Sequence, residues 1–223
     1  MDQKLILGAI KFMEEDFIEY KELFEKLAHS QTPHTLFIGC ADSRVMPNLI
    51  TNTGPGELFV VRNIANIVPK YRISEDFVAT TAAIEYALYS LNIRRVIICG
   101  HTNCGGCSAL YESDEKLNKI PNVKKWLDLM SDIKKEMLDL KFDDNQKRTY
   151  MTERLNIINS IDNLLSFPQV KEWDERKEIQ IYGWHYDIEK GLLYDYDRLD
   201  KHFKLLQKGI DYDKIYNQIF SDY

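Results

Sequence analysis

Two short polar strings constrain this chain of 223 residues more than any other feature, because each directly follows a run that is typical of a buried strand. The strings are Cys-Ala-Asp-Ser-Arg at 40–44 and Gly-His-Thr-Asn-Cys at 100–104. In an open α/β sheet, ligands bind in the crevice beyond the carboxyl ends of adjacent strands. The spacing therefore predicts that Cys40, His101 and Cys104 meet at one edge of a sheet.

Two cysteines and one histidine form a ligand set that zinc prefers, and three protein ligands leave one position of a tetrahedral zinc open. An open position indicates a catalytic zinc, because structural zinc sites use four protein ligands. We therefore expect one Zn²⁺ per chain.

Asp42 and Arg44 lie on the loop that follows Cys40, within reach of the open position. A guanidinium that binds a carboxylate through two hydrogen bonds keeps it ionised and fixes its orientation. Asp42 would then accept a hydrogen bond from water or hydroxide on the zinc. The same carboxylate could instead ligate the zinc itself, and the sequence leaves both arrangements open.

The rest of the chain alternates strand-like and helix-like segments, which predicts an α/β fold with a central, mostly parallel sheet flanked by helices. A hairpin at 189–194 would add an antiparallel edge strand. We expect strands over 35–40, 58–62, 95–99 and 178–184, helices over 5–27, 74–91 and 121–173, and a last helical stretch from about Arg198.

A chain of this length suits one domain, and we expect residues 1–223 to form it. Its first part, 1–30, is expected to form an arm with one long amphipathic helix, because apolar residues recur there every three or four positions. We interpret 120–175 as a helical elaboration that supplies packing and surface.

Charge and cysteine usage exclude several classes of protein. A net charge of −6 gives no basic surface for nucleic acid, and no apolar run approaches the length that a bilayer requires. The start of the chain lacks the features of a signal peptide. Three of the four cysteines fall within 99–107, which favours thiol or metal chemistry in the reducing cytoplasm over a disulfide framework.

Other residues allow alternative interpretations. Cys104 and Cys107 form a C-x-x-C pair that also fits a thiol redox protein. Beside the proposed ligands, however, Cys107 is better explained as a small buried residue and Cys99 as part of the core. The remaining histidines show no partner pattern and are interpreted as structural: His29, His34, His185 and His202.

The two strings resemble the C-x-D-x-R and H-x-x-C motifs of the β-class carbonic anhydrases. Residues 59–66 and 83–87 resemble further segments of that family, and the similarity is thin between residue 110 and Gly183. The resemblance implies reversible hydration of carbon dioxide to bicarbonate and a proton, by attack of zinc-bound hydroxide. It also implies that Cys40, His101 and Cys104 hold the zinc.

Further positions match one branch of the family. Gln31, Phe59 and Tyr86 match the substrate pocket of the plant-like branch, and Asp42 and Arg44 match the family's dyad. Another branch has tryptophan where this chain has Phe37, in a bicarbonate site that holds the enzyme inactive, so we expect an open, water-bound zinc at neutral pH. The resemblance also implies a homodimer or homotetramer, with the N-terminal helix packed on a neighbouring subunit.

Two rival functions share the same residues. A zinc site of this kind could hydrolyse carbonyl sulfide or carbon disulfide, since the difference would lie in access to the site. A noncatalytic zinc-binding or bicarbonate-binding module is the other, although it would have no use for the dyad formed by Asp42 and Arg44.

Overall fold

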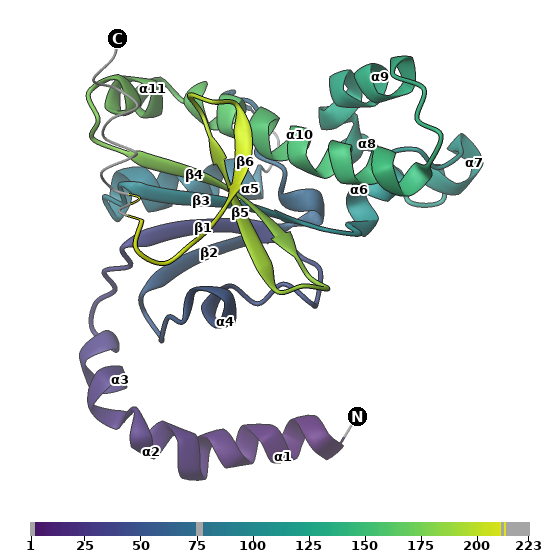
Figure 1. The fold of residues 1–223 in the computed structure, drawn as a ribbon. Coiled ribbons are helices and arrows are strands. Elements are labelled where there is room, and N and C mark those ends of the chain that lie inside the picture. Colours follow the sequence, from purple (N-terminus) through teal and green to yellow (C-terminus); the bar gives the residue numbers. More distant parts are fainter. Residues whose placement is uncertain (1–2, 75–77, 211, 213–223) are drawn as a thin grey trace.

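The computed structural model describes residues 3–74, 78–210 and 212, and it contains a six-stranded sheet with helices packed against it (Figure 1). The strand order is β2-β1-β3-β4-β5-β6. The first four strands run parallel and the last two antiparallel, which confirms the predicted α/β class. The strands are β1 (Thr35–Cys40), β2 (Leu58–Asn63), β3 (Arg95–His101), β4 (Gln180–Asp187), β5 (Leu192–Asp197) and β6 (His202–Leu205).

The main core lies between one face of the sheet and the helices α5 (Ala79–Glu85) and α10 (Asn145–Leu165). Leu36 and Ile38 of β1 point to this face, because alternate residues of a strand share a face. Phe37 points to the opposite face, where it packs with Ile97, Cys99 and Tyr182. Both faces of β1 are therefore buried, which explains why this strand is apolar throughout.

Shorter helices connect these elements. They are α4 (Pro47–Thr51), η2 (Ile64–Asn66), η3 (Tyr86–Ser90), α6 (Gly105–Ala109), α7 (Asp114–Leu117), α8 (Pro121–Leu127), η4 (Asp128–Met130), α9 (Ser131–Asp139) and α11 (Pro168–Glu175).

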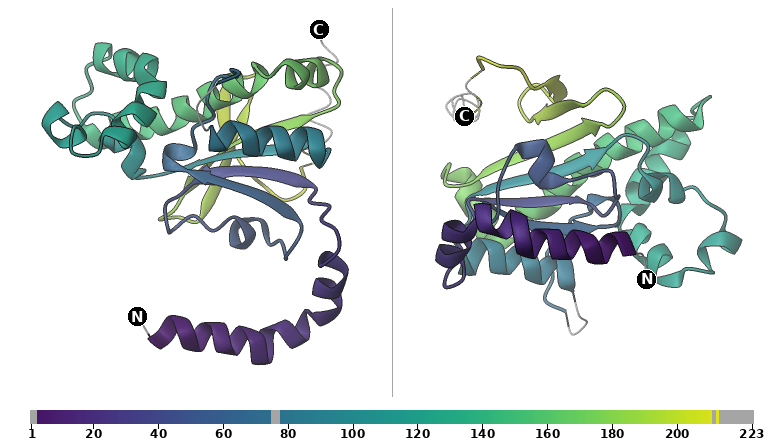
Figure 2. Two further views of the ribbon diagram at one scale, coloured as in Figure 1. Left: turned by 180° about the vertical axis from the view of Figure 1, so that it is seen from behind. Right: turned by 90° about the horizontal axis from the view of Figure 1, so that it is seen from below.

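The N-terminal arm extends away from the sheet and curves beneath it (Figures 1 and 2). It consists of α1 (Gln3–Lys11), η1 (Phe12–Asp16), α2 (Phe17–Glu19) and α3 (Lys21–Leu27), so the predicted single helix is interrupted. Tyr20, between α2 and α3, leaves the helical region with φ −102° and ψ 9°, and the arm changes direction between these two helices (Figure 1). Large apolar side chains of the arm are exposed: Leu5, Ile6, Leu7, Ile10, Phe12, Met13, Ile18 and Leu23.

Two predictions about boundaries are wrong. The helix expected from Ser74 begins at Ala79, since Val78 has a non-helical φ of −113° and ψ of 69°; residues 75–77 lie outside the described part. In place of the helix expected from about Arg198, the described part forms β6, where polar and apolar residues alternate and Phe203 packs on the main core; residues 211 and 213–223 of the expected helix lie outside the described part. Four residues of alternation are too short a signal to separate an edge strand from a helix end.

Helix α10, which lies in the stretch interpreted as packing and surface, also forms buried hydrogen bonds with a loop of the sheet. A stripe of buried polar residues runs along it and binds the segment that follows β2. Asn156 donates to the Ala65 carbonyl at 2.6 Å, and Ser160 accepts the N–H of Val68 at 3.1 Å. The helix thereby fixes the loops at the carboxyl ends of the parallel strands.

Among the described residues, no helix combines the length and the apolar character needed to span a bilayer.

Candidate metal centre

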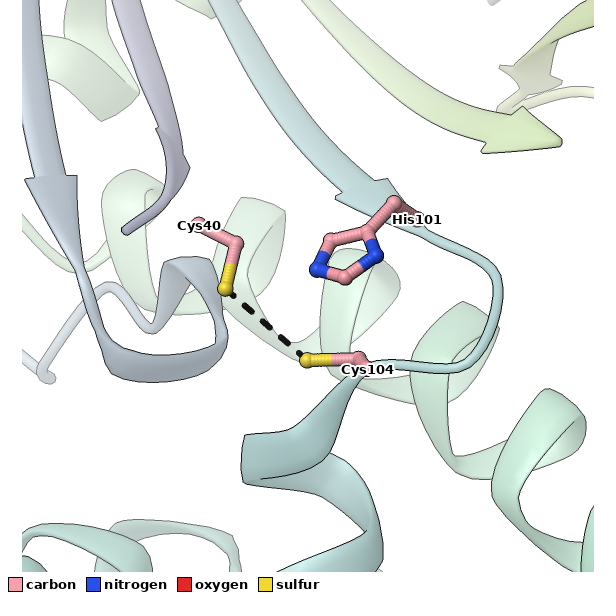
Figure 3. A group of neighbouring side chains, drawn as sticks. All are labelled: Cys40, His101 and Cys104. Carbon is pink, nitrogen blue, oxygen red and sulfur yellow. Dashed lines mark hydrogen bonds between the residues drawn. The ribbon is translucent and has the colours of Figure 1, made fainter. Parts of the chain in front are cut away.

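Cys40, His101 and Cys104 meet at the carboxyl ends of β1 and β3 (Figure 3). Cys40 is the last residue of β1, His101 is the last residue of β3, and Cys104 directly precedes α6. The chain passes from β1 to β2 on one side and later to β3 on the other, so this edge is a topological switch point, where α/β sheets bind ligands. The predicted meeting of the three side chains is confirmed.

The spacing of the three side chains fits a tetrahedral metal. Their ligand atoms lie within 4.8 Å of one another, and the two sulfurs are 3.9 Å apart. Two thiolates at 2.3 Å from a tetrahedral zinc would be about 3.8 Å apart. All three residues are buried, and in Figure 3 the imidazole of His101 faces both sulfurs.

The hydrogen bond of His101 also favours metal binding. Its Nδ1 lies 3.0 Å from the carbonyl oxygen of Thr102, which assigns the ring hydrogen to Nδ1. Nε2 is buried and has no hydrogen-bond partner among the described residues. A buried nitrogen lone pair is costly unless something binds it, and a metal beside the two sulfurs would.

Asp42 and Arg44 form a bidentate pair next to this group. Nε and Nη2 of Arg44 donate to the two carboxylate oxygens of Asp42 at 2.9 and 2.7 Å. The Arg44 guanidinium holds the pKa of the Asp42 carboxyl well below its usual range. Oδ2 of Asp42 lies 3.8 Å from Nε2 of His101, so the fixed carboxylate borders the metal group.

The two thiols hold their protons tightly in the protein without metal. The hydrogen bond with Cys104, together with burial, raises the pKa of the Cys40 thiol to about 12. The pKa of Cys104 is also raised, first by its hydrogen bond with Cys107. A metal that binds here must therefore displace protons, because thiolates are the ligands.

The peptide unit between Asn103 and Cys104 is held at both ends. Arg44 Nη2 donates to the Asn103 carbonyl at 3.1 Å, and the Cys104 N–H donates to Oε1 of Glu153 at 2.9 Å. Asn103 adopts a left-handed conformation with φ 57°, a region that asparagine tolerates better than most residues. Both contacts fix the loop that presents Cys104.

Glu153 was not identified by the sequence analysis. It is 1% exposed and lies on the buried face of α10 beside Ile157, Ile161 and Leu164. A carboxylate at helical spacing to Ile157, Ile161 and Leu164 was the available signal, since a buried charge needs a partner. One such partner is His185, whose buried ring lies 3.1 Å from Oε2 of Glu153, a contact for which the sequence showed no pattern.

A cleft of about 340 Å³ opens at the metal group. Gly106 lines the cleft and packs closely on its neighbours, since a Cβ there would lie 2.9 Å from side-chain atoms of Ile64 and Ala65. The cleft is lined by Cys40, Ala41, Asp42, Ile64, Gly105, Gly106, Ala109 and Val123.

The predicted substrate residues lie elsewhere in the chain. Phe59 and Tyr86 pack on each other with ring centroids 6.0 Å apart, and Gln31 is exposed between α3 and β1. None of the three lines the cleft at Cys40. Their role therefore stays a prediction.

The other two cysteines are buried, Cys99 in β3 and Cys107 in α6. Cys99 packs in the cluster around Phe37, as predicted for a core residue. Cys107 packs in the cluster that contains Cys40 and Cys104.

The open α/β sheet carries a group of three metal-ligand side chains, Cys40, His101 and Cys104, at its switch point. Three protein ligands leave one position of a tetrahedral metal open, so the fold and the site are those of an α/β metalloenzyme. The sequence model of the family described as "Carbonic anhydrase" matches residues 35–193. A carbonic anhydrase of Helicobacter pylori (strain J99) is 41% identical over 201 residues, which span 88% of this chain and 90% of that protein.

Solved structures agree with the sequence comparison. The β-carbonic anhydrase CcaA superposes with a TM-score of 0.86 and 36% identity over 92% of this chain and 98% of that one. A structure from a study of two tetrameric β-carbonic anhydrases of Sordaria macrospora gives a TM-score of 0.72 and 28% identity, over 86% and 95%. The chain belongs to the carbonic anhydrase family, as an enzyme of its β class.

Proposed function

We propose that this chain catalyses the reversible hydration of carbon dioxide to bicarbonate and a proton, with one zinc ion held by Cys40, His101 and Cys104. The observation that carries the proposal is the buried group of three ligand atoms within 4.8 Å, bordered by the ion pair of Asp42 and Arg44. Zinc, when bound, supplies a Lewis acid that makes water a nucleophile at neutral pH.

The residues around the centre would orient the reactants. Asp42 is an acceptor with a fixed direction, because Arg44 holds both of its oxygens. The side chains of Ile64, Ala109 and Val123 give the cleft apolar walls, which suit a nearly nonpolar substrate. The pairing of Asp42 with Arg44 supports our expectation that this carboxylate does not close the zinc site.

We propose that the chain works as a homodimer or homotetramer. The Sordaria macrospora relatives are described as tetrameric, and the arm of this chain exposes Leu5 by 72%, Met13 by 62% and Ile18 by 65%. Such apolar side chains would be buried against a neighbouring subunit. Changing all three to aspartate should lower the oligomer mass measured by light scattering, and a monomeric wild type would contradict the proposal.

The substrate roles of Gln31, Phe59 and Tyr86 remain part of this proposal. Tyr86 is 49% exposed, and neither Phe59 nor Tyr86 lines the cleft of its own chain. In the proposed oligomer, this pair would instead face the metal centre of the neighbouring subunit. We also keep the cytoplasm as the predicted compartment, since the four cysteines are unpaired thiols.

Comparing substrates separates the proposed function from its rivals. Zinc-loaded protein should hydrate carbon dioxide much faster than it hydrolyses carbonyl sulfide or carbon disulfide. Faster release of hydrogen sulfide would instead favour the sulfur substrates. Zinc-loaded protein with neither activity would favour a noncatalytic binding module.

A further inference from the structure

We infer that Glu153 and His185 act together as positioning residues for the metal ligand Cys104. Glu153 lies on α10 and His185 on β4, and neither belongs to the predicted ligand set. The inference rests on the proposed zinc site, since it concerns how one ligand of that site is held.

The first step is the geometry of the peptide between Asn103 and Cys104. In a trans peptide the C=O and the N–H point in opposite directions. Arg44 donates to the carbonyl at 3.1 Å, and Glu153 accepts from the N–H at 2.9 Å, so the two side chains hold the peptide from opposite sides. Arg44 ties the loop to Asp42, whereas Glu153 ties it to the core of the protein.

The second step is what holds Glu153. Its Oε2 lies 3.1 Å from Nε2 of His185, and because a carboxylate only accepts, Nε2 is assigned as the donor. The exposed fractions are 1% for Glu153 and 0% for His185. The ring of Tyr150 packs edge-on against the imidazole, with centroids 5.1 Å apart. The side chains of Glu153 and His185 are therefore held in one orientation by burial and by their contacts.

The third step is where His185 lies in the sheet. It is opposite Gly100 in the pairing of β3 with β4, one position before the ligand His101. The pair of Glu153 and His185 thus links β4, the neighbour of the strand that ends at His101, with the loop that carries Cys104. Only Cys104 is hydrogen-bonded to the pair, and His101 lies one position further along the paired strand.

A purely structural role for the pair is the competing explanation. The two roles differ in what a substitution changes, because positioning acts on the metal while structural packing acts on the whole fold. Groups that orient metal ligands typically alter metal affinity by about 10-fold to 100-fold when they are removed. Ser160 offers a matched control, since it is also buried on α10 and accepts a backbone N–H, from Val68.

The test measures zinc release from the full-length, zinc-loaded protein into an excess of a coloured chelator, at a temperature where circular dichroism shows each variant folded. Glu153→Ala and His185→Ala should release zinc about 10-fold to 100-fold faster than the wild type. The rate of zinc release from Ser160→Ala should stay within about 3-fold of the wild-type rate, below the range expected for groups that orient ligands.

Glu153→Gln provides the rescue. Its amide oxygen can accept the Cys104 N–H, and its NH₂ can donate to the other tautomer of His185. Its rate of zinc release should stay within about 3-fold of the wild-type rate, which is below the increase expected when an orienting group is lost. The cobalt-substituted protein gives a second readout, because the thiolate-to-cobalt absorption band should shift in Glu153→Ala and not in Ser160→Ala.

The inference is overturned if Glu153→Ala releases zinc no faster than Ser160→Ala, or if Glu153→Gln releases it as fast as Glu153→Ala. Should Glu153→Ala not fold, the same comparison with His185→Ala decides. A wild type that holds zinc but does not hydrate carbon dioxide would refute the proposed function without affecting the positioning role of Glu153 and His185. Equal zinc release from all variants of an active enzyme would refute the positioning role and leave the proposed function intact.

Discussion

Arg44 Nη2 lies 3.1 Å from the carbonyl oxygen of Asn103, so the guanidinium that holds Asp42 also holds the loop that carries Cys104. This contact joins the two polar strings of the sequence directly. A change at Arg44 would therefore disturb both the orienting carboxylate and a metal ligand, and it would not report on either one alone. Substitutions at Asp42 and at the cysteines separate these effects better.

The two cysteines of the C-x-x-C pair should behave differently when each is changed to serine. Cys104→Ser removes a proposed zinc ligand and should lower zinc affinity by more than about 100-fold, the upper end for changes outside the ligand set. Cys107→Ser should keep both zinc and activity. Metal analysis after dialysis, with a rate measurement on each variant, checks this. Loss of activity in Cys107→Ser with zinc retained would instead support a thiol redox role.

Asp42→Asn should keep its zinc and lose most of its activity. The amide is isosteric with the carboxylate, but it cannot form the same charged pair with Arg44, and one of its two acceptor atoms becomes a donor. We expect kcat to fall by about 100-fold or more, as for the loss of a group that handles a proton. An active, zinc-loaded Asp42→Asn variant would remove this residue from the mechanism.

Zinc binding should become stronger as the pH rises. The metal-free thiols are protonated near neutrality, since the pKa of Cys40 is about 12 and that of Cys104 is also raised, whereas zinc binds thiolates. Two released protons correspond to an affinity that rises about 100-fold per pH unit between pH 8 and 9. Chelator competition measures the affinity, and proton release in weak buffer counts the protons. An affinity that is independent of pH would show that the thiols are already ionised.

Asp195 should make the protein less stable as the pH rises toward 7. Burial raises the pKa of Asp195 to about 7, above its ordinary value of 3.8. The folded state therefore binds an extra proton between these values, and that stabilisation is lost as the pH rises through about 7.

The variant Asp195→Asn removes this titration while its amide oxygen can still accept the Gly183 N–H, which the aspartate accepts at 3.2 Å. Its Tm should exceed that of the wild type by about 3 °C at pH 8, with a smaller difference at pH 5. The exposed Asp143 supplies the control, and Asp143→Asn should leave Tm unchanged at both pH values. A gain in Tm that is equal at pH 5 and pH 8 would contradict the titration.

The metal group could be predicted from sequence because each ligand lies at or just after a strand. Each of these strands is recognised from its own apolar residues, which are close to the ligand in sequence. The contacts of Glu153 could not, since its bond to Cys104 spans 49 residues and its bond to His185 spans 32. Nothing in a local pattern specifies which loop a helix residue meets. The strand β6 was missed for a different reason, because four residues at a sheet edge give too little periodicity.

The positions of Phe59 and Tyr86 show a further limit. Their side chains pack on each other, as neighbours in a substrate pocket would, yet they do not line the cleft of their own chain. A motif match proposes residues for a substrate pocket, but it does not say whether they reach the metal group of their own chain.

The most direct test of the central claim titrates zinc into metal-free protein and follows carbon dioxide hydration by stopped flow near pH 8.5. We predict that the rate rises in proportion to bound zinc and reaches its plateau at one zinc per chain. Full zinc loading without carbon dioxide hydration, or a rate that does not depend on zinc, would contradict the account.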